Sequence, residues 1–122
     1  MSRCQLQRPA QAVAAAEPGN VLTLDRARIV RALSHRERYK YVRPQVQREG
    51  MGWKVLSPNC SRKVDAAGGT IDIAWLVPVG GGLWLLHARD HQQGSWVLKG
   101  WGLSLEQALA RLCADPHREY WL

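Results

Sequence analysis

The sequence has few cysteines, few acidic residues and no long apolar run, and each shortage argues against a class of protein. Three cysteines occur among the 122 residues, Cys4, Cys60 and Cys113, and their odd number and wide spacing make a poor disulfide framework, so a reducing compartment is favoured. No stretch approaches the roughly 18 apolar residues that a membrane-spanning helix needs, and the first residues lack the apolar core of a secretory signal. We therefore expect a soluble cytoplasmic protein with no membrane partner.

The sequence patterns that accompany catalysis or cofactor binding are also missing. The glycines at 80–82 lie between two expected strands instead of opening a helix, so they do not form a phosphate-binding loop. The ten acidic residues are not paired at a spacing typical of acid–base hydrolysis. We expect no cofactor and no bound metal, and a non-enzymatic function is favoured over an enzymatic one.

Positive charge is concentrated in one short segment. The formal net charge is +7, and the segment from Arg26 to Arg48 holds eight basic residues against the single acid Glu37, whereas residues 51–122 are nearly neutral. Arginine greatly outnumbers lysine, and its planar guanidinium both pairs with phosphate and stacks on bases. The segment therefore predicts a surface for a polyanion, and the alternative is a solvated face that keeps a tryptophan-rich protein in solution.

The chain divides into a flexible arm over residues 1–20 and a single domain over residues 21–122. A first helix is expected from about Leu24 to Glu37, with Thr23 at its N-terminus. A closing helix begins after Ser104, which forms a capping box with Gln107, and ends before Asp115.

Five strands are expected between the helices, at Tyr39–Pro44, Trp53–Leu56, Thr70–Val77, Leu83–Arg89 and Trp96–Trp101. The first is an edge strand because it ends in proline, and the fourth is a central strand covered on both sides because both of its faces are apolar. Short turns favour an antiparallel meander, so the fold class is α+β, with a helix before the strands and another after them on one sheet face. Two short helices leave the second face uncovered, which makes a homodimer the simplest partner.

The side-chain pattern adds two expectations about packing. Ile71, Ile73, Trp75 and Val77 alternate along one strand and are expected on one side of it. Of the six tryptophans, Trp101 and Trp121 are expected at the surface, and the other four are expected to pack in the core.

Exposed aromatic rings among cations suit single-stranded or looped RNA better than duplex grooves, so RNA is favoured over DNA. Tyr39 and Tyr41 share one side of the expected edge strand within the basic segment, although both rings could instead pack beneath the first helix. The expected nucleic-acid-binding residues are Arg28, Arg31, Arg36, Arg38, Tyr39, Lys40, Tyr41, Arg43, Arg62 and Lys63.

Two other functions remain open at this point. Cys60 lies in a long polar loop, where it is a candidate nucleophile with His87, Asp90 and His91, although it is equally consistent with a small buried plug. His87 and His91 are also spaced for a metal, but the turn between them does not imply ligand geometry. The third function is a protein-interaction module that uses the uncovered sheet face.

Several stretches resemble a family of small bacterial proteins, domain of unknown function 3024. The resemblance rests on Arg38–Val42, the block Trp53–Arg62 that contains SPNCSR, Ile71–Trp75 and Trp84–His87, and it extends from about Leu24 to Trp121. It implies a bacterial, cytoplasmic protein and assigns no catalytic residue.

Overall fold

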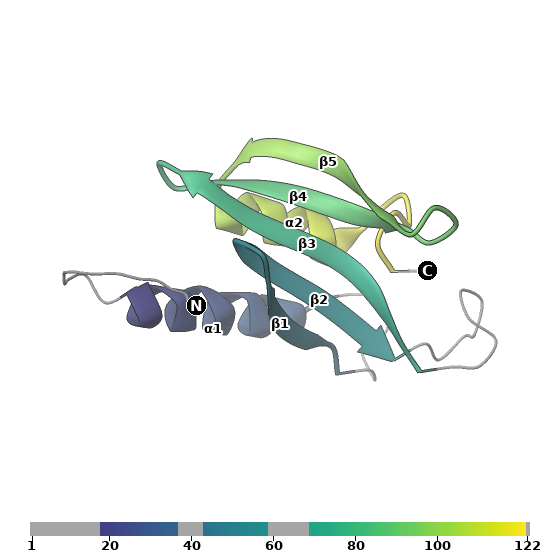
Figure 1. Cartoon of the computed structure of the whole chain (residues 1–122), viewed down its shortest axis with the longest axis horizontal. Coiled ribbons are helices and arrows are strands. Elements are labelled where there is room, and N and C mark those ends of the chain that lie inside the picture. The colour runs from purple at the N-terminus through teal and green to yellow at the C-terminus, as the bar shows by residue number, and fades with distance from the viewer. Residues whose placement is uncertain (1–17, 37–42, 59–68, 122) are drawn as a thin grey trace.

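The protein is a two-layer α+β structure in which an antiparallel sheet carries two helices. The computed structural model describes residues 18–36, 43–58 and 69–121. The elements follow in the order α1 (Pro18–Leu33), β1 (Gln45–Glu49), β2 (Gly52–Pro58), β3 (Thr70–Gly80), β4 (Leu83–Asp90), β5 (Ser95–Leu103) and α2 (Leu105–Ala114). The strands pair in chain order, each antiparallel to the next (Figure 1). This meander with a helix before it and a helix after it confirms the predicted fold class.

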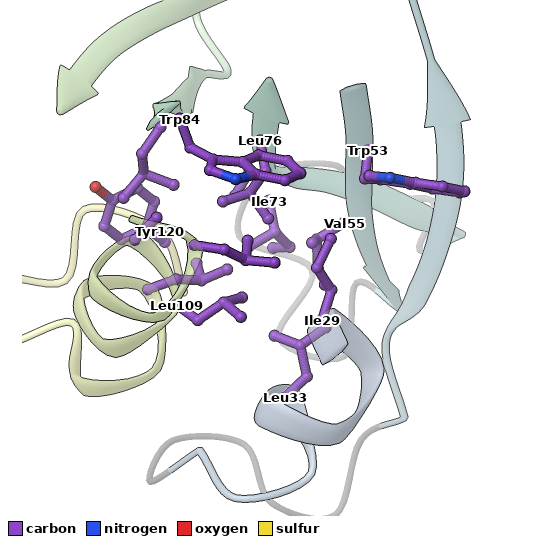
Figure 2. Close-up of a cluster of buried hydrophobic side chains, with 14 of the residues drawn as sticks. Ile29, Leu33, Trp53, Val55, Ile73, Leu76, Trp84, Leu109 and Tyr120 are labelled. Atoms are coloured by element: carbon purple, nitrogen blue, oxygen red, sulfur yellow. The ribbon is translucent and has the colours of Figure 1, made fainter. Parts of the chain in front are cut away.

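Both helices lie on the same side of the sheet, and the core fills the space between the two layers (Figure 1). Ile29 and Leu33 of α1 and Leu109 of α2 point toward Val55 and Leu76 of the central strands (Figure 2). Burial of each such aliphatic side chain contributes about 1.5–3 kcal/mol relative to its exposure, so this interface stabilises the contact between the two layers.

An irregularity in β3 reverses the side on which its residues lie. Val55 pairs with Ala74, but Leu56 pairs with Asp72, so β3 carries one extra residue at this point. Ile73 and Ala74 are consequently both buried, and the core-facing set continues with Leu76. The prediction that Trp75 and Val77 share the side of Ile71 and Ile73 is therefore wrong, because a bulge shifts the alternation by one residue.

The first helix begins and ends earlier than the sequence pattern predicts. It starts at Pro18 instead of Leu24, so the helix includes residues 18–20. Proline is well tolerated in the first turn because its missing N–H has no partner there anyway. Residues 1–17 lie outside the described residues. After Leu33 the chain tightens, since the backbone N–H of His35 donates to the carbonyl of Ala32, three residues back, at 3.0 Å.

The first edge strand lies later in the chain than expected. β1 begins at Gln45, directly after Pro44, which is not part of the strand because proline cannot donate to a ladder. The expected strand positions 39–42 lie outside the described residues. The other four strands and the capping box of Ser104 and Gln107 agree with the sequence prediction.

The face of the sheet away from the helices, called the outer face below, is not covered within the described part of the chain. In β4 the side chains of Trp84, Leu86 and Ala88 are buried beneath the helices, whereas Leu83 on the opposite side is 45% exposed. Within one chain the helices therefore cover only one side of this strand. Its apolar second face reflects a partly open surface, and the expected second copy on that surface stays a prediction.

The residues after α2 turn back into the core. The buried carboxylate of Asp115 accepts hydrogen bonds from the backbone N–H groups of Glu119, Tyr120 and Trp121 at 2.7–3.3 Å. The indole N–H of Trp121 donates to the carbonyl of Leu112 at 2.9 Å. Trp121 is consequently only 1% exposed, so the prediction that it lies at the surface is wrong, while Trp101 is 69% exposed as expected.

Replacement of Gly52 by alanine tests the close approach of β2 and β3. An added Cβ would overlap the carbonyl oxygen of Leu76 and come within 2.9 Å of the Cα of Val77, both of which are backbone atoms. We expect Gly52→Ala to lower the free energy of unfolding by about 1–3 kcal/mol, because the backbone must move to relieve the overlap. Urea denaturation followed by tryptophan fluorescence measures the change.

The matched control is Gln47→Ala on the exposed part of β1, which should stay within about 0.5 kcal/mol of the wild type. Equal midpoints for the two variants would contradict the proposed strand packing.

Candidate nucleic-acid interface

A groove between α1 and α2 brings together two exposed arginines and an apolar floor. Its volume is about 440 Å³, and its polar lining comes from Arg28, Arg31 and His35 of the α1 region and Glu106 of α2. The floor is formed by small or aliphatic side chains of the two helices and by a thiol, namely Ala32, Leu109, Ala110 and Cys113. A cationic rim above an apolar floor suits an anionic ligand that also has an apolar surface.

The periodicity of the first helix places these arginines at the surface. Ile29 and Leu33 are four residues apart and are buried against the sheet. Arg28 and Arg31, three residues apart, point to the other side and are exposed. Within the described residues neither side chain makes an ion pair or a hydrogen bond, so their guanidinium groups are available to a ligand. These two arginines of the basic segment are therefore at the surface of the protein.

Arg36 is not part of that surface. Its side chain is 3% exposed, its Nη1 donates to the carbonyl of Leu33 at 2.8 Å, and its guanidinium lies 4.8 Å from the ring centroid of Trp121. Burial lowers its pKa below the ordinary value. The assignment of Arg36 to phosphate binding is therefore wrong. Helical periodicity places Arg28 and Arg31 on the exposed side of α1, but it does not apply to Arg36, because the helix ends at Leu33 and the chain then turns toward the core.

Other arginines of the basic segment are bound to backbone carbonyls. Arg26 donates to the carbonyl of Val46 at 3.2 Å, and Arg48 donates to that of Gly52 at 3.3 Å. Arg43 is exposed just before β1. The remaining predicted nucleic-acid-binding residues lie outside the described residues: Arg38, Tyr39, Lys40, Tyr41, Arg62 and Lys63.

On the outer face the cations are neutralised by nearby carboxylates. The Lys54 ammonium lies 3.7 Å from Glu49 and 3.5 Å from Asp72, and Arg89 Nε lies 3.8 Å from Asp72. The Arg89 guanidinium also lies 4.9 Å from the ring centroid of Trp96. This face therefore carries little uncompensated charge, in contrast to the groove between the helices.

The histidines of the enzyme hypothesis belong to this outer face and its rim. The ring of His87 contacts that of Trp75 at 4.8 Å, and its Nδ1 lies 3.1 Å from the carbonyl oxygen of Trp75. His91 follows in the turn where the Asp90 carboxylate accepts two backbone N–H bonds at 3.0 Å. Cys60 lies outside the described residues, so the nucleophile hypothesis stays a prediction. Among the residues that the structure places, no three His, Cys, Asp or Glu side chains gather as metal ligands.

Cys113, at the floor of the groove, is a half-buried thiol. Burial raises its pKa, an effect that the charge of Arg36 partly offsets. Its Sγ lies 3.4 Å from the carbonyl oxygen of Ala32, which brings α2 against α1. Since the thiolate is the nucleophilic form, a raised pKa does not favour a nucleophilic role, and the contacts of Cys113 are those of a packing residue.

Sequence reasoning missed Glu106, Leu109 and Ala110 as groove residues. The amphipathic pattern of the closing helix identifies a buried side, but it does not show that its margin lies beside α1. A second hollow of about 400 Å³ adjoins the groove and shares Arg28 and Glu106 with it. No signal in the sequence pairs these two residues, because they are far apart in the chain.

The fold and the groove define a small α+β domain with two helices on one face of a five-stranded meander. The chain belongs to the family described as domain of unknown function (DUF3024), whose model matches residues 19–122, and this confirms the resemblance drawn from the sequence. No curated protein and no solved structure matches the chain. In the part of the chain that is described, no helix has the length and apolar character to cross a membrane.

The protonation of His91 gives a test of the electrostatics at the outer rim. Burial lowers its pKa, Arg89 acts in the same direction, and Asp72 and Asp90 oppose them. The unfolded chain therefore binds this proton more readily, so stability falls as pH decreases below the ordinary histidine pKa of about 6.5. We expect His91→Gln to lose less stability than the wild type between about pH 7.5 and pH 5, measured as urea midpoints. An identical pH dependence in the two proteins would contradict this assignment.

Proposed function

We propose that the protein is a non-enzymatic, cytoplasmic RNA-binding protein that contacts phosphates through Arg28 and Arg31. The observation that carries the proposal is that, within the described part of the chain, some cationic side chains are paired with carboxylates and others are not. Arg28 and Arg31 are exposed without a carboxylate partner among the described residues, whereas Lys54 and Arg89 are paired with acids. A polyanion gains most where positive charge is not already neutralised.

Single-stranded or looped RNA fits this surface better than a duplex. The two guanidinium groups line a groove with an apolar floor, which offers nothing to the phosphates of a regular duplex but can contact an unstacked base. Arginine can also pair with a phosphate and stack on a base at the same time. The outer face, with its half-buried tryptophans and neutralised charges, is instead where we propose that a second copy of the chain packs.

The test is the salt dependence of binding to a short, labelled, unstructured RNA, followed by fluorescence anisotropy. If about four phosphates are neutralised, the slope of log affinity against log salt should be near −3. Arg28→Ala with Arg31→Ala should reduce that slope by roughly 1.4 and weaken binding about tenfold or more at low salt.

The matched control removes two other cations, both of which are paired with acids, as Arg89→Ala with Lys99→Ala. This double variant lowers the net charge by the same two units as Arg28→Ala with Arg31→Ala, and it should leave the slope of log affinity against log salt close to that of the wild type. A flat salt response in the wild type, or equal losses in the two double variants, would overturn the proposal.

A further inference from the structure

The apolar floor of the groove shows that phosphate contact alone does not account for its shape. Ala32, Leu109, Ala110 and the Cys113 thiol present no charge and few hydrogen-bonding groups to a ligand. A phosphodiester is strongly hydrated and gains nothing from such a floor, whereas the face of a nucleobase does. At about 440 Å³ the groove falls within the range of small-molecule sites, which is suitable for one nucleotide unit.

The two arginines define where the phosphate of that nucleotide lies. Arg28 and Arg31 are on one side of the groove, on the exposed side of α1, and the floor belongs largely to α2. A nucleotide whose phosphate pairs with α1 therefore directs its base across the groove toward α2. His35, which is also exposed on the α1 side, adds a further nitrogen donor near the phosphate.

Glu106 stands on the α2 side of the groove and selects among bases. A carboxylate repels phosphate, so its presence in the same groove as Arg28 is unfavourable for a site that binds only anions. It is suitable, however, for accepting a hydrogen bond from an exocyclic amine, as glutamate does with the N4 amine of cytosine. Uracil presents a carbonyl oxygen at the same position, and two acceptors facing each other repel.

We infer that the groove between α1 and α2 binds one unpaired nucleotide whose base carries an exocyclic amine. Arg28 and Arg31 hold its phosphate, the floor around Leu109 packs against the base, and Glu106 accepts from the amine. This inference rests on the proposed RNA binding and adds to it a preference among bases.

The experiment compares oligocytidylate with oligouridylate of equal length, because the two bases have the same size and differ at position 4. The wild type should bind the cytidine oligomer at least about fivefold more tightly. Glu106→Gln should abolish most of that ratio, whatever it does to the overall affinity, because an amide also presents a donor to the uracil carbonyl. The change in net charge in Glu106→Gln affects the two oligomers equally, because they carry the same number of phosphates, so it does not alter the ratio of their affinities.

A second variant fills the groove without changing its charge. Ala110 is exposed at the margin of the groove, so Ala110→Phe should weaken binding of oligocytidylate about tenfold and leave the salt slope unchanged. Val30→Phe places the same ring on an exposed part of α1 that does not line the groove, and it should bind as the wild type does. Circular dichroism of both variants confirms that each is folded.

The outcomes separate this inference from the proposed function. If binding depends on Arg28 and Arg31 but the two oligomers bind equally and Ala110→Phe has no effect, RNA binding stands and the nucleotide site is overturned. If removal of the two arginines leaves binding unchanged, the proposed function itself is overturned, and the inference falls with it. A preference for oligocytidylate that survives in Glu106→Gln would overturn the role assigned to that carboxylate.

Discussion

The placement of the two helices depends on the buried carboxylate of Asp115. By accepting hydrogen bonds from the backbone N–H groups of residues 119–121, it turns the chain after α2 back into the core. Trp121 then lies under the guanidinium of Arg36, just beyond the end of α1, so the ends of the two helices are linked. Because a buried carboxylate without partners is costly, these hydrogen bonds and the turn form together. This link holds together the C-terminal ends of the two helices whose side chains line the groove.

The positively charged side chains of the outer face are paired with carboxylates, whereas those on the exposed side of α1, as far as the structure describes the chain, are not. On the outer face Lys54 and Arg89 are held by Glu49 and Asp72, and the resulting surface is close to neutral. On the helical side the exposed arginines of α1 have no such partners among the described residues. The same formal charge thus supports solubility and sheet packing in one place and leaves a surface suited to anions in the other.

Local sequence patterns predicted the order of the helices and strands correctly, but they did not predict which side of β3 each residue lies on. The capping box of Ser104 and Gln107 is a short-range hydrogen-bonded unit, so its position in the sequence locates the start of α2 directly. The bulge at Ile73 and Ala74 has no comparable local mark, because it arises from the pairing of β3 with β2. One extra residue there was enough to reverse the side predicted for Trp75.

The sequence by itself determined the antiparallel meander, the two flanking helices and the exposure of Arg28 and Arg31, since each follows from periodicity or from contacts between near neighbours in the chain. Only the tertiary structure decided that Arg36 and Trp121 are buried together, and that Glu106 lies across a groove from Arg28. These relations join residues far apart in the chain, and whether a cation is free or enclosed depends on which distant side chains the packed layers bring beside it.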